Sequence, residues 1–177
     1  VLLCENMTGW RNLMTLSSLS FTEGFYGKPR VDTELLRKHH EGLIALSACL
    51  SGEIPRRLCA GDYSGAVEAA RQMADIFGPD HFCIEIQNHR LPEEKQILPQ
   101  LVRLARELEL PLVATNDCHY LRREDAGMQE ILTCIATNRT LQDGGRVGFA
   151  TDEFYYKTTA EMQALFPAFP EALENTV

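Results

Sequence analysis

The residues best suited to chemistry lie in the segment 115–120, Thr-Asn-Asp-Cys-His-Tyr, which follows a short apolar run at 110–115. Such a run is typical of a buried strand. Because strand side chains alternate, Asp117 and His119 are predicted to project to one side and Cys118 to the other. A carboxylate and an imidazole there can share one cation, and this donor mixture suits Zn²⁺, Mn²⁺ or Fe.

An alternative interpretation of these residues needs no metal. Asp117 would cap the following helix, and His119 would make a surface hydrogen bond. Taken alone, the D-x-H spacing favours this alternative, because it is too short to be specific. Asn116 directly precedes Asp117 and is predicted to line the same site if a site exists.

Cys49 and His89 also follow predicted strands, at residues 42–47 and 82–87. In α/β folds, ligands bind at the carboxyl ends of parallel strands. The Cys49 thiolate, on a turn of small residues at 48–52, is therefore a candidate ligand facing the same site as Asp117 and His119. A buried inert cysteine and a structural histidine are the alternatives for Cys49 and His89.

The cysteines show no C-x-x-C pair, so a structural zinc finger is not expected. Thiols stay reduced in the cytosol, where the chain is predicted to reside. Apart from Cys49, most of the six are predicted to be small buried hydrophobes.

Elements that position these residues alternate along the chain between apolar strands and amphipathic helices. This pattern predicts an α/β fold with βα units around a parallel sheet or barrel. Thr8 is the predicted cap of the first helix, and Asp32 the predicted cap of a short second one. The longer helices are predicted at residues 9–22, 62–77, 92–108 and 123–136.

Residues 138–177 differ in character from the preceding part, and a boundary is predicted between 1–137 and 138–177. A glycine-bearing loop at 143–146 leads to an aromatic-rich stretch at 149–156. Two short helices are predicted at about 159–166 and from 170 onward. We expect this tail to connect to another domain.

The composition is that of a globular protein, with 45% apolar and 24% charged residues. The net charge of −8 disfavours a nucleic-acid groove over most of the surface, because an acidic surface repels phosphate. No apolar run approaches the roughly 20 residues that span a bilayer. No secretory signal is visible either, so neither a membrane association nor export is expected.

Longer strings carry a family resemblance: EGFYGKPRVD (23–32), EGLIALSACLSGEIP (41–55), LVATNDCHY (112–120) and TDEFYYK (151–157), followed by PEALENT (170–176). They resemble the family of bacterial replicative DNA polymerase III alpha subunits. The resemblance implies the C-terminal part of the polymerase and histidinol phosphatase (PHP) domain, a distorted β/α barrel. Residues 1–137 would belong to that domain, and 138–177 would lead toward the polymerase thumb and palm.

The same resemblance implies a multinuclear site for divalent metal, Zn, Mn, Mg or Fe, in which Cys49, Asp117 and His119 are the late ligands. The early ligands would lie upstream of Val1. A start without Met and an end within a helix also favour a fragment. Bound cations would activate water for 3′–5′ exonuclease chemistry on DNA. The isolated chain is expected to bind metal poorly and to lack nuclease activity.

For the parent protein, the resemblance implies a cytoplasmic DNA-directed DNA polymerase, a nucleotidyltransferase that binds DNA and deoxynucleotides. Its implied partners are the proofreading subunit and the sliding clamp. Two alternatives remain open. One is a non-catalytic module that braces the polymerase and binds partners, and the other is a free-standing phosphatase of the same superfamily.

Overall fold

The computed structural model describes residues 1–142 and 148–176. The predicted glycine loop at 143–146 lies outside these residues. The chain divides into two compact units. Unit 1 comprises residues 1–85 and 100–112, and unit 2 comprises residues 86–99 and 113–177. The predicted boundary near residue 138 is a different division and stays a prediction.

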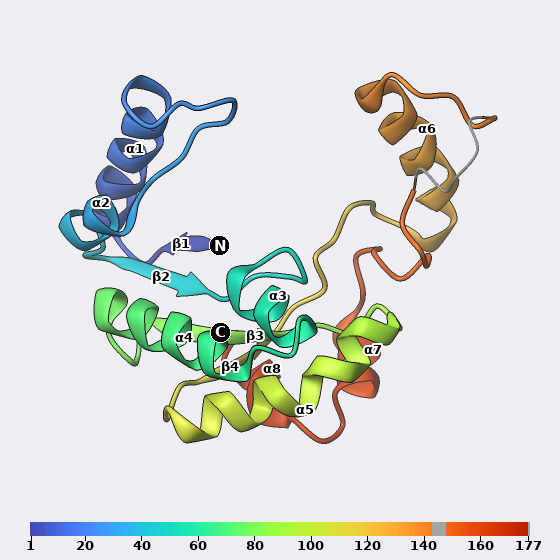
Figure 1. The fold of residues 1–177 in the computed structure, drawn as a ribbon. Helices are drawn as coiled ribbons and strands as arrows, with labels where there is room; N and C mark the ends of the chain where they lie inside the picture. Colours follow the sequence, from blue (N-terminus) through green and yellow to red (C-terminus); the bar gives the residue numbers. More distant parts are fainter. Residues whose placement is uncertain (143–147, 177) are drawn as a thin grey trace. The chain divides into compact units, whose positions relative to one another are not determined.

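The secondary structure follows the predicted alternation (Figure 1). In chain order the elements are β1 (Leu2–Cys4), α1 (Met7–Thr22), α2 (Thr33–Lys38), β2 (Leu43–Leu46), α3 (Glu53–Cys59), α4 (Tyr63–Phe77), β3 (Phe82–Ile86), α5 (Pro92–Glu107), β4 (Leu112–Ala114), the 3₁₀ helix η1 (Arg123–Asp125), α6 (Ala126–Thr137), α7 (Thr159–Leu165) and α8 (Pro170–Glu174).

The strands form one four-stranded sheet in the order β1-β2-β3-β4. β2 and β3 run parallel, with Ala45 opposite Phe82. Backbone bonds from Ile84 N to Pro111 O (2.8 Å) and from Thr115 N to Ile86 O (3.1 Å) show the stagger of parallel neighbours. The α/β prediction is confirmed.

β1 was not predicted, and it adds an antiparallel edge to the sheet. It pairs with β2 so that Leu2 lies opposite Ala45 and Cys4 opposite Leu43. A strand of three residues is too short to show an alternating pattern. The strand β1 forms because it pairs with β2, about forty residues away, and sequence periodicity does not predict such a partner.

Two predicted helix caps have different outcomes. Asp32 caps α2 by accepting a hydrogen bond from Leu35 N (2.8 Å), as predicted. The prediction for Thr8 is wrong, because Asn6 caps α1 and accepts from Thr8 N (2.9 Å) and Gly9 N (3.0 Å). The helix therefore begins two residues before the predicted start, and Asn is as good an N-cap as Thr.

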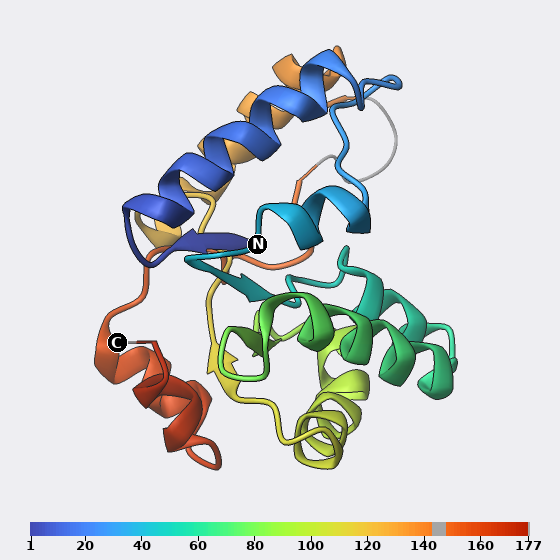
Figure 2. The same cartoon turned by 90° about the vertical axis from the view of Figure 1, so that its left-hand side faces the viewer.

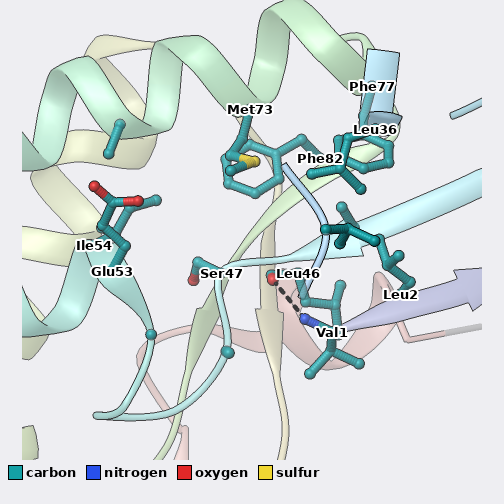
Figure 3. Close-up of a pocket in the computed structure, with 15 residues that line it drawn as sticks. Val1, Leu2, Leu36, Leu46, Ser47, Glu53, Ile54, Met73, Phe77 and Phe82 are labelled. Carbon is teal, nitrogen blue, oxygen red and sulfur yellow. Dashed lines mark hydrogen bonds between the residues drawn. The ribbon is translucent and has the colours of Figure 1, made fainter. Parts of the chain in front are cut away.

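Unit 1 is built on an apolar interface between its helices and strands. α3 and α4 lie side by side (Figure 2), and Ala66 and Ala70 on α4 are fully buried. An apolar pocket of about 310 Å³ opens beside β2 (Figure 3). It borders the turn that follows β2, and its larger lining side chains are Leu36, Leu46, Met73, Phe77 and Phe82.

Unit 2 buries an unusual number of polar side chains. Its apolar core includes Ile86, Ile97, Val113, Phe154 and Phe166. Buried among them are the polar side chains of His89, Glu94, Asn116, Glu153 and Lys157. Buried polar groups need hydrogen-bond partners, so these residues define the interior of unit 2 as much as the apolar ones do.

Within the described residues, no helix has the length and apolar character needed to cross a membrane.

Candidate metal site

Cys49 lies in unit 1, on a tight turn between β2 and α3. Gly52 N donates to the Cys49 carbonyl oxygen (2.8 Å), and Ala48 adopts a left-handed backbone with φ of 65°. At the start of the turn, the Ser47 hydroxyl accepts a hydrogen bond from Glu85 N (2.8 Å). The Cys49 side chain is half-buried, so the thiol is neither sealed in the core nor fully exposed.

The six cysteines form no disulfide, and all six lie in described residues. Only Cys83 and Cys134 are buried, so the prediction that most of them are buried hydrophobes is wrong. Burial raises the pKa of the Cys83 thiol. The three exposed cysteines are Cys4 on the edge strand β1, Cys59 at the end of the short helix α3, and Cys118 in the loop after β4.

Asp117 and His119 lie in unit 2, on the loop that follows β4. The strand ends at Ala114, so the alternation assumed for Asp117, Cys118 and His119 does not apply. The backbone instead turns at Asp117, where φ is 41°. It then meets the segment 153–155, where His119 N donates to Phe154 O (2.8 Å). A loop, rather than a strand, therefore presents both side chains.

The His119 ring is oriented by its own loop. Its Nδ1 lies 2.7 Å from the Asp117 carbonyl oxygen, which can only accept, so Nδ1 carries the donated hydrogen. In the neutral imidazole this leaves the lone pair on Nε2. The ring also contacts Phe149 and Phe154, with centroids 4.4 and 5.7 Å away. Metal-binding histidines commonly donate their second ring N–H to a backbone carbonyl in this way.

The alternative role for Asp117 as a helix cap is not observed. η1 is capped by Arg122, and Asp125 occupies the cap position of α6. Among the described residues, the Asp117 carboxylate makes no hydrogen bond or ion pair. The surface hydrogen bond proposed for His119 does exist, but its acceptor is the Asp117 backbone.

His89 and Asn116 are brought together in unit 2, and both are engaged within the protein. His89 Nε2 lies 2.6 Å from Asn116 O, and its Nδ1 lies 2.5 Å from Glu94 Oε1. The Asn116 amide nitrogen donates to Tyr155 O (2.6 Å). With both ring nitrogens bonded, His89 has no lone pair to offer a cation in this arrangement. Asn116 Oδ1 is buried and has no hydrogen-bond partner among the described residues.

Sequence reasoning missed the charged cluster around Glu153, whose side chain is 2% exposed. Its carboxylate pairs with Arg90 Nε (3.0 Å), Arg123 Nη1 (3.1 Å) and Lys157 Nζ (3.3 Å). Burial lowers the pKa of Lys157, whereas hydrogen bonds with Tyr155 and Glu153 raise the pKa of Arg123. The partners lie up to about sixty residues apart in sequence, and residues 153–157 are not helical, so no local spacing rule predicts the cluster.

The three predicted ligands share one property: their metal-binding atoms are not engaged by the protein. The Cys49 thiol, the Asp117 carboxylate and His119 Nε2 make no hydrogen bond or ion pair within the described chain. Their thiolate, carboxylate and imidazole donors fit Zn²⁺ and related cations. Across residues 1–142 and 148–176, no three His, Cys, Asp or Glu side chains gather closely enough to hold an ion by themselves.

Comparison with known proteins gives a consistent result. The model of the PHP domain family matches residues 1–89. The chain is similar to the DNA polymerase III subunit alpha of Treponema pallidum, with 50% identity over 177 residues, covering 100% of this chain and 15% of that protein.

Two further relatives carry the same name. The Thermus aquaticus protein is 47% identical over 179 residues, covering 99% of this chain and 15% of the relative. The Borreliella burgdorferi protein is 44% identical over 177 residues, covering 100% of this chain and 15% of the relative. The chain thus spans about 15% of the length of these relatives.

Proposed function

Because this chain belongs to the PHP domain family, we propose that it forms one side of a metal-dependent phosphoesterase site within a bacterial replicative DNA polymerase. The reaction we propose for the site is hydrolysis of a phosphodiester at the 3′ end of DNA. Similarity to several DNA polymerase III alpha subunits, along nearly all of this chain and 15% of each relative, supports the polymerase context. In that context the protein would act on DNA and deoxynucleotides in the cytoplasm, together with a proofreading subunit and a sliding clamp.

The observation that carries the proposal is the orientation of His119. Its Nδ1 is held by the Asp117 carbonyl oxygen at 2.7 Å, which leaves Nε2 without a partner in the described chain. The Asp117 carboxylate, two residues earlier in the chain, likewise makes no hydrogen bond or ion pair among the described residues. The Asp117 side chain is half-buried and His119 is exposed, so both groups are accessible from solvent and can bind a cation together with further ligands.

We assign the roles as follows. His119 Nε2, an Asp117 carboxylate oxygen and the Cys49 thiolate would hold divalent metal, of the Zn, Mn, Mg or Fe type. When bound, the metal would lower the pKa of coordinated water and stabilise charge on phosphoryl oxygens. The protein's own contribution is to fix the tautomer of His119 and to leave His119 Nε2 and the Asp117 carboxylate without hydrogen bonds to the described residues.

A second candidate is a non-catalytic module that braces the polymerase and binds its partners. One observation favours it: His89 and Asn116, the two residues predicted to line the site, make internal hydrogen bonds rather than binding a ligand. Asp117 and His119 would then hold a structural metal or none. The two candidates differ in whether the protein degrades DNA.

The test uses the full-length protein that carries these residues. Degradation of a 3′-labelled oligonucleotide is measured with Mn²⁺ or Zn²⁺, before and after Asp117→Ala and His119→Ala. We expect both variants to lose degradation while DNA synthesis on a primed template continues. Glu124→Ala is the matched control, since Glu124 is an exposed carboxylate on η1 that makes no side-chain hydrogen bond or ion pair with the described residues, and it should change neither activity.

Each outcome separates the candidates. Unchanged, metal-dependent degradation by Asp117→Ala would remove Asp117 from the site. A parent protein that degrades no DNA, but binds metal through Asp117, would support the structural module. Loss of synthesis together with degradation would indicate misfolding, and the Glu124→Ala control would show whether any surface change on this segment has that effect.

A further inference from the structure

His89 is a buried histidine whose side chain contacts Asn116 and Phe154, two residues that hold the loop carrying Asp117 and His119. We infer that His89 and Glu94 form a positioning pair, which holds the backbone of residues 116–119 in the conformation that the two candidate ligands need. This inference rests on the proposed function, because it assigns a purpose to that conformation. Neither residue of the pair is expected to touch metal or substrate.

The first contact fixes the start of the loop. His89 Nε2 lies 2.6 Å from the carbonyl oxygen of Asn116, the residue before Asp117, and the side chain is 1% exposed. A carbonyl oxygen only accepts, so Nε2 donates. A hydrogen bond shielded from water is stronger than an exposed one, and it sets the direction of the peptide that leads into Asp117.

The second contact fixes the end of the loop. The His89 ring stacks on Phe154, with centroids 4.0 Å apart and planes 6° from parallel. The Phe154 carbonyl oxygen in turn accepts a hydrogen bond from His119 N at 2.8 Å. One imidazole therefore contacts both supports of the loop, its first carbonyl group and the residue that binds His119.

Glu94 holds the histidine in place. Its Oε1 lies 2.5 Å from His89 Nδ1, and its Oε2 accepts from His89 N (2.6 Å) and Leu91 N (3.3 Å). A proton lies between His89 Nδ1 and Glu94 Oε1, carried by either the imidazole or the carboxyl group. Glu94 is the third residue of α5 and satisfies backbone donors at the start of that helix, so the pair is anchored to a rigid element.

A histidine that only fills the core would not need this set of contacts. The backbone of Asp117 lies in the left-handed region, with φ of 41°, which is uncommon for a residue with a side chain. Such conformations persist where surrounding contacts over-determine them, and they cluster at functional sites. The His89–Glu94 pair provides this constraint within a few bonds of Asp117.

The first measurement is hydrogen exchange of the peptide spanning residues 113–121 in the full-length protein, without added metal. Loss of the Nε2 hydrogen bond in His89→Ala should speed exchange about tenfold, the factor expected for one hydrogen bond. His89→Gln keeps an amide donor and Glu94→Gln keeps an acceptor, so both should have smaller effects. The conservative variants also cover the case in which His89→Ala does not fold.

The second measurement is affinity for Mn²⁺ alone, followed by electron paramagnetic resonance. Replacement of groups that orient metal ligands typically lowers affinity about 10- to 100-fold, and we expect that loss for His89→Ala, with a smaller one for Glu94→Gln. Leu104→Ala is the stability control, since Leu104 is a buried residue of unit 1. It should lower the unfolding temperature but leave loop exchange and Mn²⁺ affinity unchanged.

The outcomes distinguish this inference from the proposed function. If Asp117→Ala weakens Mn²⁺ binding but the His89 and Glu94 variants change neither readout, the positioning role is wrong and the metal site stands. The positioning role is also wrong if Leu104→Ala reproduces both changes, because they would then follow from lost stability. If Asp117→Ala leaves Mn²⁺ affinity unaltered, the site assignment fails and the positioning role fails with it.

Discussion

The turn after β2 and the loop after β4 each present candidate ligands, but they are held by different means. The turn with Cys49 is shaped by small residues and by backbone bonds that span a few positions, such as Gly52 N to Cys49 O. The loop with Asp117 and His119 is held by side chains and carbonyl groups from residues 89 and 153–155. The turn is a local structure, whereas the loop depends on distant parts of the chain.

This difference determines how each region should respond to change. Steric changes in the backbone should disturb the turn, because little else defines its path. Loss of a buried polar side chain should disturb the loop, because unpaired buried groups are costly. Four substitutions test this distinction, in order of decreasing expected effect.

Asn116→Ala should have the largest effect and should lower the free energy needed to open the loop after β4 by about 3 kcal/mol. The Asn116 amide nitrogen donates to Tyr155 O (2.6 Å) and Glu153 O (3.3 Å), and truncation removes both hydrogen bonds. Glu153 O keeps Lys157 Nζ as a donor, whereas Tyr155 O keeps only the long contact from Cys118 Sγ (3.7 Å). A buried acceptor left without a good donor costs roughly 1–3 kcal/mol. Native-state hydrogen exchange of residues 113–121 measures the change.

Asn88→Ala is the matched control for that prediction. Asn88 is half-buried, and among the described residues its amide nitrogen makes one long hydrogen bond, to Leu165 O at 3.4 Å, while its Oδ1 accepts from N of the exposed residue Arg90 (3.2 Å). Its replacement should cost about 1 kcal/mol or less. Equal effects of the two substitutions would mean that buried amide contacts do not hold the loop.

Gly52→Ala should have the next largest effect and should act on the turn after β2. An added Cβ would lie 2.3 Å from Ser47 O and 3.1 Å from Cys49 O, both of them backbone atoms that cannot move aside freely. Forcing an extra methyl group into such a space typically costs about 1–3 kcal/mol. Hydrogen exchange of residues 43–53 should increase, while that of residues 113–121 should not.

Gly61→Ala separates steric crowding from backbone strain. Gly61 has φ of 77° and no atom within 4 Å of an added Cβ, so the substitution imposes strain without a clash. The expected cost is roughly 1–2 kcal/mol, and the turn after β2 should be unaffected. If Gly61→Ala opened that turn as Gly52→Ala does, crowding against Ser47 O would not be the cause.

The same contrast explains what the sequence could predict. The strand at 42–47, the small-residue turn and the position of Cys49 depend on local patterns, and the structure has β2 at Leu43–Leu46 followed by that turn. The strand before Asp117 was also predicted, but its extension to residue 119 was wrong. Beyond the strand, the backbone bonds instead to Phe154 through His119 N. No pattern near Asp117 in the sequence predicts a contact with a residue nearly forty positions away.

The candidate site shows the same limit at the level of single residues. Asp117 and His119 were identified by type and spacing, and Cys49 by its place after a strand. The Nδ1 hydrogen bond that fixes His119, and the Glu94 carboxylate that fixes His89, depend on tertiary structure. Glu94 in particular carries no signal in the sequence that sets it apart from other helix carboxylates, and it is buried.

Ala48→Gly should have a smaller effect, of the opposite sign. Ala48 adopts φ of 65°, a conformation that costs a residue with a Cβ roughly 1–2 kcal/mol. Glycine removes that strain but loses about 0.5–1 kcal/mol through the greater freedom of the unfolded chain. The net gain should be under about 1 kcal/mol, seen as slower exchange of residues 43–53. Faster exchange there would show that the Ala48 methyl group stabilises the turn.

Glu161→Gln should have the smallest effect, because Glu161 supports the loop after β4 only through Tyr155. Tyr155 Oη donates to Glu161 Oε1 (2.6 Å), and Thr158 N donates to Oε2 (2.8 Å). These hydrogen bonds, that from Tyr155 first, lower the pKa of Glu161 from 4.5 to about 2. A carboxyl group whose pKa is lowered on folding stabilises the folded state above its unfolded pKa, and that contribution is lost as pH falls through the folded value.

The difference in urea midpoint between the unsubstituted protein and the Glu161→Gln variant should therefore be constant above about pH 5.5. The Glu161 carboxyl group, whose pKa in the unfolded chain is 4.5, is ionised there in both states. It should shrink as the pH falls from there toward about 2. Glu171→Gln in α8, where the side chain is exposed, is the control and should show no such trend. A difference that stayed constant between pH 5 and pH 3 would mean that the Tyr155–Glu161 contact does not distinguish the folded from the unfolded state. The support of residues 153–155 would then come from the buried contacts of Asn116 and Lys157 alone.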